Sequence, residues 1–148
     1  MNDDESDAMW KIYVDGTGGI AIRSSISRLK QCFHDCQEEI GLGKISYITN
    51  DPTGPHVDHV ARRFMRKRLA FKHEQEARLV FYDPKQGHTG RTGIQIPVDV
   101  HVLIERIVVS PRAEEWFIAL VRKLITKLGY DFEVIPSESS APLPIVGG

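Results

Sequence analysis

Apolar and polar residues follow two different periodicities along this chain, and together they predict an α+β protein. Alternation with a period of two predicts strands over residues 19–25, 44–49, 76–82, 93–100, 103–110 and 131–135. Apolar residues at helical spacing predict helices over residues 26–39, 57–72 and 111–128. We therefore expect a mixed, largely antiparallel sheet of five or six strands that pairs, in a single layer, with three helices.

The helix expected after residue 110 has the clearest pattern. Ser110 suits the N-cap, Pro111 suits the first helical position, and Gly129 suits the stop. One continuous apolar stripe follows helical spacing, and it consists of Ala113, Trp116, Phe117, Leu120, Val121, Leu124, Ile125 and Leu128. We expect this whole stripe to lie in the core and to carry no chemistry.

Glycine and proline residues predict where other elements end, and the composition of the two termini predicts where the ordered domain ends. Gly41 and Gly43 are expected to end the helix over 26–39, and Pro97 is expected to place the strand over 93–100 at a sheet edge. The acidic start, residues 1–8, and the end, residues 137–148, are expected to be disordered. Order should begin at Met9 or Trp10. A single domain over residues 9–136 is therefore predicted.

Composition supports a globular protein with no strong preference for polyanions. The chain has 148 residues, 41% of them hydrophobic, and a formal net charge of -1. That charge argues against a dedicated nucleic-acid binder, although the basic segment 62–68 keeps such a partner open. No apolar run approaches the roughly 20 residues that span a bilayer. We expect a cytoplasmic protein in which Cys32 and Cys36 are thiols.

The candidate site lies in the segment 67–83. If the chain is extended there, Glu74, Glu76 and Arg78 share one face of a strand. Two carboxylates at this spacing either repel one another, which raises the pKa of one, or share cations such as Arg78, Arg23 or Lys67. The first arrangement suits acid–base chemistry and the second is a structural network. Both interpretations are open.

Two other constellations have ordinary explanations beside the functional one. A basic cluster could hold phosphates or could be a solvated helix face, and it consists of Arg62, Arg63, Arg66, Lys67 and Arg68, to which a loop could add Lys85, His88 and Arg91. Soft ligands sufficient for zinc are present at Cys32, His34, Cys36, His56 and His59. Their spacing is irregular, so we predict no metal site.

The order of three motifs resembles the bacterial and phage-borne family catalogued as domain of unknown function 2971. The three are MWKIYVDGTGGIAIRSSISRLK, KRLAFKHEQEAR and GIQIPVDVHVLIERIVVSPRAEEWF, and the resemblance covers roughly residues 9–135. It implies candidate ligand-binding and catalytic positions at Trp10, Tyr13, Arg23, Lys67, Glu74, Glu76 and Arg78. The aromatic residue before the glutamates, often tryptophan in the family, is Phe71 here. The N-terminal half of longer relatives, with its Asn-Asp-Pro segment, has no counterpart.

A second similarity is to ADP-ribosyltransferases, which combine an arginine, a serine and a Glu-x-Glu pair. Here one expected strand carries Arg23, Ser24 and Ser25, and Glu74 and Glu76 stand at the start of another. The resemblance implies that Arg23 would grip the phosphates of NAD and that Glu76 would stabilise an oxocarbenium-like centre. Unlike in that family, the arginine and the serine are adjacent.

These observations support three classes of function. The first is a domain that binds a phosphate-bearing or nucleotide ligand, or a partner, through Arg23, Lys67, Glu74, Glu76 and Arg78. The second is an NAD-dependent enzyme in which Glu76 and Glu74 are catalytic. The third is a protein-interaction module in phage defence or counter-defence. The first is our leading hypothesis.

Overall fold

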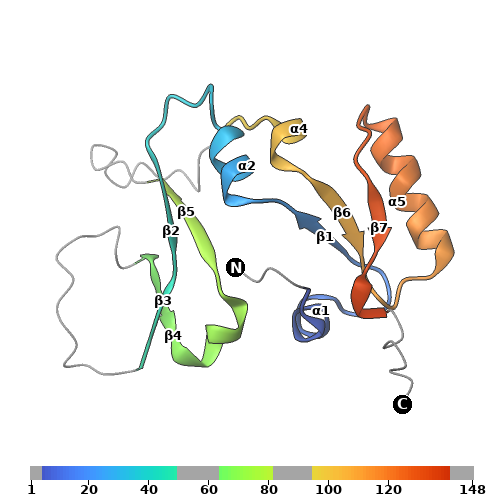
Figure 1. The fold of residues 1–148 in the computed structure, drawn as a ribbon, viewed down its shortest axis with the longest axis horizontal. Coiled ribbons are helices and arrows are strands. Elements are labelled where there is room, and N and C mark those ends of the chain that lie inside the picture. The colour runs from blue at the N-terminus through green and yellow to red at the C-terminus, as the bar shows by residue number, and fades with distance from the viewer. Residues whose placement is uncertain (1–4, 50–63, 82–94, 141–148) are drawn as a thin grey trace, which may run out of the picture. The chain divides into compact units, whose positions relative to one another are not determined.

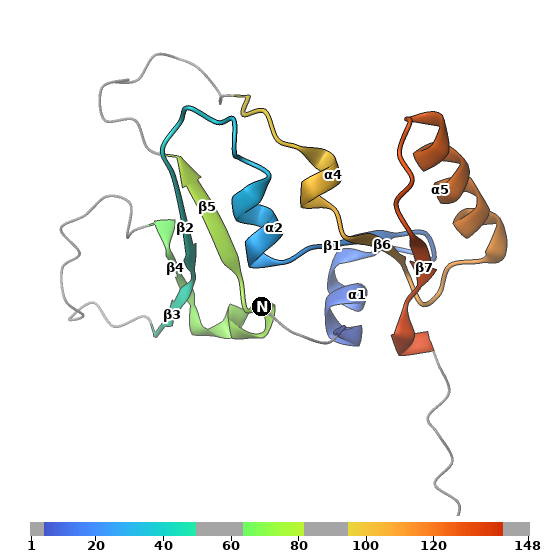
Figure 2. The same cartoon turned by 45° about the horizontal axis from the view of Figure 1, so that its top comes forward.

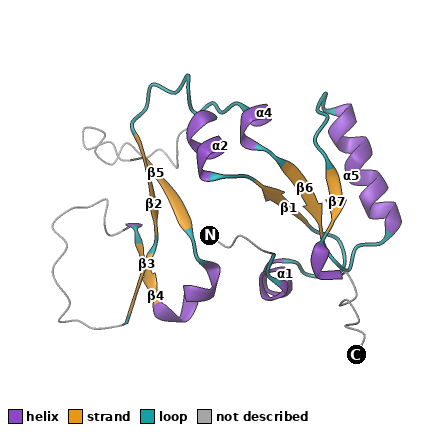
Figure 3. Cartoon of the chain, viewed as in Figure 1, coloured by secondary structure: helices purple, strands orange, loops and turns teal. Residues whose placement is uncertain are grey.

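The computed structural model describes residues 5–49, 64–81 and 95–140, and the chain divides into two compact units. Of the described residues, unit 1 contains 36–49, 64–81 and 95–96, and unit 2 contains 5–35 and 97–140. The described residues contain both helices and strands, the strands in mixed sheets (Figure 3), which confirms the α+β class. The described residues form seven strands in three small sheets, whereas five or six strands were expected in one sheet. The single domain over residues 9–136 stays a prediction.

Unit 2 is built on a mixed three-stranded sheet with the order β1-β6-β7. Strand β1 (Ile20–Arg23) runs antiparallel to β6 (Arg106–Val109), and β7 (Val134–Pro136) runs parallel to β6. Helix α5 (Glu115–Lys127) lies beside β7 (Figure 1). Apolar residues of β6, β7 and α5 make the core, which contains Ile107, Val109, Ile118, Val121 and Val134.

Only part of the expected apolar stripe of α5 is core. Ile118 and Val121 are buried against the sheet, and Phe117 and Ile125 pack at the edge of that core. Four members of the stripe are more than half or about half exposed, namely Trp116, Leu120, Leu124 and Leu128. The prediction that the whole stripe is core was therefore wrong. Three strands offer too narrow a face to cover a stripe this wide.

The helix also begins later than expected. Ser110 is a buried residue that accepts a hydrogen bond from the backbone of Arg112, which makes a turn before the helix. Glu114 is the N-cap, and the first helical residue is Glu115. The Ser-Pro start therefore encodes a turn here, and Gly129 ends the helix with a positive φ of 82°, as its place in the sequence predicts.

Three shorter elements complete the framework of unit 2. Helix α1 (Asp7–Tyr13) begins two residues before the expected start of order. Helix α2 (Ile26–Gln31) is capped by Ser25, whose hydroxyl accepts from the amide of Arg28. Helix α4 (Val100–Leu103) begins at the last residue of the segment 93–100, which was predicted as an edge strand, and the Asp99 carboxylate caps it by accepting from the amide of Val102. Residues 95–99 of that segment form no strand, and residues 93 and 94 lie outside the described ranges. No helix in the described ranges has the length and hydropathy to cross a membrane.

The N-terminal segment of unit 2 holds its last described residues. The Glu5 carboxylate accepts hydrogen bonds from the hydroxyl of Ser137 and from the backbone amide of Glu138. Ser137 is buried, and it follows β7 directly. A short 3₁₀ helix, η2 (Glu138–Ser140), begins there. Glu5 and Ser137, both within the ends expected to be disordered, thus contact one another, while residues 1–4 and 141–148 lie outside the described ranges. The disorder expected for the two ends stays a prediction.

Unit 1 contains two strand pairs. Strand β2 (Ile40–Lys44) runs antiparallel to β5 (Ala77–Phe81), and the two lie side by side in both views (Figures 1 and 2). Strand β3 (Ser46–Ile48) runs parallel to β4 (Arg66–Arg68). A 3₁₀ helix, η1 (Leu69–Glu74), connects β4 to β5. These elements position the candidate site.

Two predicted helices in this part of the sequence differ from the structure where residues are described, one in its length and one in its kind of element. Helix α2 stops at Gln31, and Gly41 and Gly43 lie within β2, opposite Val80 and Arg78. A Cβ on Gly43 would lie 2.5 Å from the methyl group of Met65, so glycine leaves room for that side chain. Residues 66–68 form β4 and not a helix, because β3 offers them a partner strand; residues 57–63 lie outside the described ranges.

Candidate functional site

A left-handed residue between the two glutamates sets the geometry of the candidate site. Glu74 is the last residue of η1, and Glu76 immediately precedes β5. Between them Gln75 has φ 44° and ψ 47°, and its amide donates to the carbonyl of Lys72. Glu74 therefore does not share a strand face with Glu76, as the extended-chain hypothesis required. The turn at Gln75 brings both carboxylates to the same cation.

That cation is Lys67, at the centre of β4. Its ammonium group donates to the Oε2 of Glu74 and lies 3.3 Å from the Oε2 of Glu76. The side chain of Glu74 is only 10% exposed, which makes it the most buried member of the group. The ammonium also lies 4.9 Å from the ring centroid of Phe71, a cation–π distance. Phe71, on η1, thus supports the same lysine.

Arg78 holds the second glutamate from the opposite side. Its Nε donates to Oε1 of Glu76, and its Nη2 donates to Oε2 at 3.1 Å. This bidentate arrangement is the strong form of an arginine–carboxylate pair. The remaining Nη1 donates to the carbonyl of Phe64 at 2.7 Å. Four predicted site residues, Lys67, Glu74, Glu76 and Arg78, therefore lie together in one network, which we call the ion network.

The ion network keeps Glu76, Lys67 and Arg78 ionised. The hydrogen bond from Arg78 lowers the pKa of Glu76, and Lys67 adds to the effect against the opposing influence of burial. The same contacts raise the pKa of Arg78, while the hydrogen bond to Glu74 raises that of Lys67. Glu76 is therefore a carboxylate at neutral pH and is poorly suited to donate a proton. Of the two interpretations offered by the sequence, this arrangement matches shared cations.

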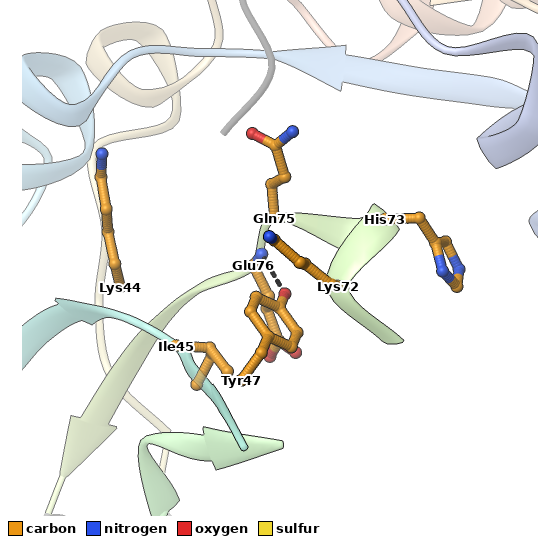
Figure 4. Close-up of a pocket in the computed structure, with 7 residues that line it drawn as sticks. All are labelled: Lys44, Ile45, Tyr47, Lys72, His73, Gln75 and Glu76. Atoms are coloured by element: carbon orange, nitrogen blue, oxygen red, sulfur yellow. Dashed lines mark hydrogen bonds between the residues drawn. The ribbon is translucent and has the colours of Figure 1, made fainter. Parts of the chain in front are cut away.

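A pocket open to solvent, about 600 Å³ in volume, lies beside the ion network (Figure 4). Its residues come from β2, the segment that joins β2 to β3, β3, η1 and the turn that follows, and they are Lys44, Ile45, Tyr47, Lys72, His73, Gln75 and Glu76. The hydroxyl oxygen of Tyr47 accepts from the backbone amide of Glu76 at 2.7 Å. In the close-up, Lys44 and Gln75 extend in the same direction, while the His73 ring points away from the other side chains.

The charge of this pocket comes from its lysines. In the ion network two cations face two carboxylates, so the formal charges of its four members cancel. Among the described residues, neither Lys44 nor Lys72 forms an ion pair. The hydroxyl of Tyr47 has accepted one hydrogen bond and still has its own proton to donate. The pocket therefore offers two positive charges and several donors to an anion.

The other predicted site residues lie in unit 2. Arg23, on β1, has its Nε 3.8 Å from a carboxylate oxygen of Glu105. Trp10 is buried in α1, with its indole nitrogen 3.4 Å from the carboxylate of Glu5. Tyr13, at the end of α1, is largely exposed. The structure assigns Arg23 a carboxylate partner within its own unit.

Other candidates fall partly outside the described ranges. These are Arg62, Arg63, Lys85, His88 and Arg91 of the basic cluster, with His56 and His59 of the zinc set. Cys32 and Cys36 are free thiols in different units, and burial raises the pKa of Cys32. Within the part of the chain that is described, no three metal-ligating side chains cluster together.

Sequence reasoning did not single out Lys44, Tyr47 or Lys72. Lys44 is the last residue of β2 and Lys72 lies on η1, and neither stands in a motif. One signal was available for Tyr47, since alternation in the strand 44–49 places Tyr47 on the opposite face from Ser46 and Ile48. The left-handed turn that brings these residues to one pocket has no glycine or asparagine to mark it.

No protein-family model matches this chain, and neither a curated protein nor a solved structure matches it. The resemblance to domain of unknown function 2971 therefore stays a hypothesis that rests on the quoted motifs.

Proposed function

We propose that this protein binds a small phosphate-bearing ligand, such as a nucleotide, in the pocket beside the ion network. The observation that carries the proposal is the pair of lysines, Lys44 and Lys72, that line this pocket without a carboxylate partner among the described residues. A volume of about 600 Å³ falls in the range of small-molecule sites, roughly 300–1,000 Å³. Lysine ammonium groups bind phosphate as point charges.

The ion network has a supporting role in this proposal. Lys67 and Arg78 are engaged by Glu74 and Glu76, so their donors are directed to carboxylates and not to the pocket. Their contribution is to fix the Glu76 backbone, whose amide in turn holds the hydroxyl of Tyr47. A ligand would then meet a Tyr47 side chain that is already oriented. Preorganised donors bind more tightly because less freedom is lost on binding.

The chemistry of the pocket favours an anion with several acceptor oxygens. Lys44, Lys72 and the hydroxyl of Tyr47 are donors. The apolar contribution comes from Ile45 and the Tyr47 ring. A phosphate with an attached nucleoside matches this combination better than an inorganic phosphate ion does. The nucleoside can contact the Tyr47 ring and the Ile45 side chain, whereas an inorganic ion makes no favourable contact with apolar groups.

Isothermal titration with ATP, ADP, NAD and inorganic pyrophosphate tests the proposal. We expect at least one nucleotide to bind, with an affinity that falls as salt rises, because the attraction is between exposed charges. Changing both lysines, Lys44→Gln and Lys72→Gln, should weaken binding at least tenfold. The matched control is Lys30→Gln, which removes the same charge from an exposed position on α2 in unit 2.

Two results would overturn the proposal. One is the absence of heat and of any competition across the whole set at millimolar ligand. The other is a double variant that binds as tightly as the Lys30 control, because it would mean that the pocket is not where the phosphates lie. Turnover of NAD, measured in the same samples, would move the assignment to the enzyme hypothesis, in which Glu76→Gln must abolish activity.

A further inference from the structure

The exposed part of the α5 stripe lies on one flank of the helix. Trp116, Leu120, Leu124 and Leu128 are spaced four residues apart, and 59%, 51%, 50% and 60% of their surfaces are exposed. With 3.6 residues per turn, they make a continuous row roughly a quarter-turn away from the buried residues Ile118 and Val121. Four large apolar side chains in one exposed row are uncommon on a monomer and mark an interaction surface.

Two contacts show which side of the helix this row occupies. On the opposite flank, Arg122 donates to the carbonyl of Val134 in β7, the edge strand farthest from β1. On the near flank, the Phe117 ring lies so close to the segment before β1 that a Cβ on Gly18 would be 3.0 Å away from it. The exposed row therefore faces the β1 side of the sheet.

Strand β1 contributes a second exposed apolar surface there. Ile20 pairs with Val109 and Ile22 pairs with Ile107, and directly opposite residues in an antiparallel pair share a face. Val109 and Ile107 are buried beneath α5, so Ile20 and Ile22 lie on the face that the helix covers. Both are nevertheless exposed, by 48% and 57%. The helix covers β6 and β7 and leaves β1 bare.

The α5 row and the β1 face thus form two walls of a surface that would accept one more helix beside α5. Its charges identify the helix that fits. Glu114, whose carboxylate accepts from the indole of Trp116 at 3.0 Å, lies at the N-terminal end of the row. Lys127, an exposed residue, lies at the C-terminal end beside Leu124 and Leu128. An antiparallel copy of the same helix would bring each carboxylate to the other's ammonium group.

We propose that this surface is a dimer interface, in which α5 of a second copy lies antiparallel along the row and over Ile20 and Ile22. An antiparallel pairing is self-complementary, as a two-fold interface must be. The six exposed apolar side chains of each copy would bury on the order of 1,000 Å² in total, near the lower limit for a specific interface. The dimer is therefore reversible, and Trp116 is its anchor, because tryptophan dominates such contacts.

Sedimentation equilibrium of the full chain over a range of concentrations tests this proposal. We expect a monomer–dimer equilibrium, which Leu120→Lys should weaken at least tenfold, since a charge then enters the apolar row. The matched control is Thr126→Lys, which adds the same charge on the opposite flank of α5. Circular dichroism confirms that each variant keeps the helix, so a loss of dimer is not a loss of fold.

Charge reversal tests the antiparallel orientation. Glu114→Lys and Lys127→Glu should each weaken the dimer, and the double variant should recover at least part of the loss, because the two signs are exchanged together. A chain that stays monomeric at the highest concentration overturns the proposal. So does a dimer that is indifferent to Leu120→Lys, or one in which the double variant is as weak as the sum of the single changes.

Discussion

The guanidinium of Arg78 donates to both carboxylate oxygens of Glu76, two positions earlier in the chain. The same arginine donates to the carbonyl of Phe64, just before β4, so one side chain links the start of β5 to the segment that leads into β4. Lys67 completes the arrangement from β4 itself. Because Glu76 and Arg78 neutralise one another, the pair stabilises unit 1. It also fixes the backbone of Glu76, which lines the pocket.

Replacing Arg78 should destabilise unit 1 selectively. In Arg78→Gln, the Glu76 carboxylate keeps Lys67 as its one ionic partner among the described residues, and the Phe64 carbonyl loses its donor. We expect a loss of about 1 kcal/mol in the free energy of unfolding, because the arginine is one-third exposed and solvent screens the pair. Both tryptophans, Trp10 and Trp116, belong to unit 2. Tryptophan fluorescence should therefore change less than hydrogen exchange of the β5 amides.

The control for Arg78 is an exposed pair in the other unit. Lys11 and Asp7 form an ion pair on α1, and both side chains are more than half exposed. Lys11→Gln should change stability by a few tenths of a kcal/mol at most. Equal losses in the two variants, or a β5 exchange pattern that Arg78→Gln leaves unchanged, would contradict the role assigned to the bidentate pair.

The stability of unit 1 should fall at acidic pH, because protonation of Glu76 removes its pairing with Arg78 and Lys67. Its pKa is lower in the folded protein than the ordinary value of 4.5, so the unfolded chain binds a proton more readily. The stabilisation is then fully present above the unfolded value and is lost as the pH falls through the lower folded value. Glu76→Gln should therefore be less stable than the wild type at pH 7, and the two should converge as the solution becomes strongly acidic.

Acid unfolding followed by far-UV circular dichroism measures this convergence. Glu39→Gln, at an exposed position before β2, is the matched control because it removes one carboxylate without touching the ion network. If the difference between wild type and Glu76→Gln stays constant from neutral to acidic pH, the pairing with Arg78 and Lys67 is not the source of the effect.

A third prediction concerns the hydrogen bonds by which Glu5 holds the last described residues of unit 2. Its carboxylate accepts from Ser137, from the amide of Glu138 and from Trp10. Burial acts to raise the pKa of Glu5, but these hydrogen bonds outweigh it and lower the pKa overall. Glu5→Gln should speed hydrogen exchange at residues 138 and 139 about tenfold, equivalent to about 1.4 kcal/mol of lost protection.

Asp7→Asn serves as the comparison, since Asp7 contacts only the exposed Lys11 among the interactions described for it. Amides at 138 and 139 should exchange at the wild-type rate in that variant. Unchanged exchange in Glu5→Gln would show that β7 alone orders the residues that follow it, with no help from the N-terminal segment.

The elements predicted well from the sequence are those with a strong local pattern and a partner that the pattern implies. The strand over Ile20–Arg23 and the helix that reaches Lys127 both follow clear periodicity. The strand predicted over 93–100 is absent from the described residues of that segment, since residues 95–99 form no regular element and the Asp99 cap starts a helix at Val100. The hydrogen bond between Glu5 and Ser137 could not be predicted from the sequence, because it joins residues at opposite ends of the chain.

The sequence predicted which residues make up the ion network, but it did not predict how the backbone brings them together. Lys67, Glu74, Glu76 and Arg78 do lie together, but the sequence offered a shared strand face as the reason. The cause is a turn that only the backbone angles of Gln75 reveal. Glutamine gives no signal for the left-handed region, whereas glycine or asparagine would have done so.

The conformation of Gln75 leads to a final prediction about how the two glutamates reach one lysine. Its left-handed backbone ends η1 and sends the chain into β5, and a β-branched residue is strongly disfavoured there. Gln75→Val should therefore cost about 1–3 kcal/mol of unit 1 stability. Gln75→Asn, which keeps an amide and tolerates this region, should cost far less.

Nuclear magnetic resonance of the Lys67 side chain distinguishes the two variants, because only the valine should free its ammonium group from Glu74 and Glu76. A valine variant that is as stable as wild type and leaves that ammonium signal unchanged would mean that β4 and β5 alone hold the ion network together.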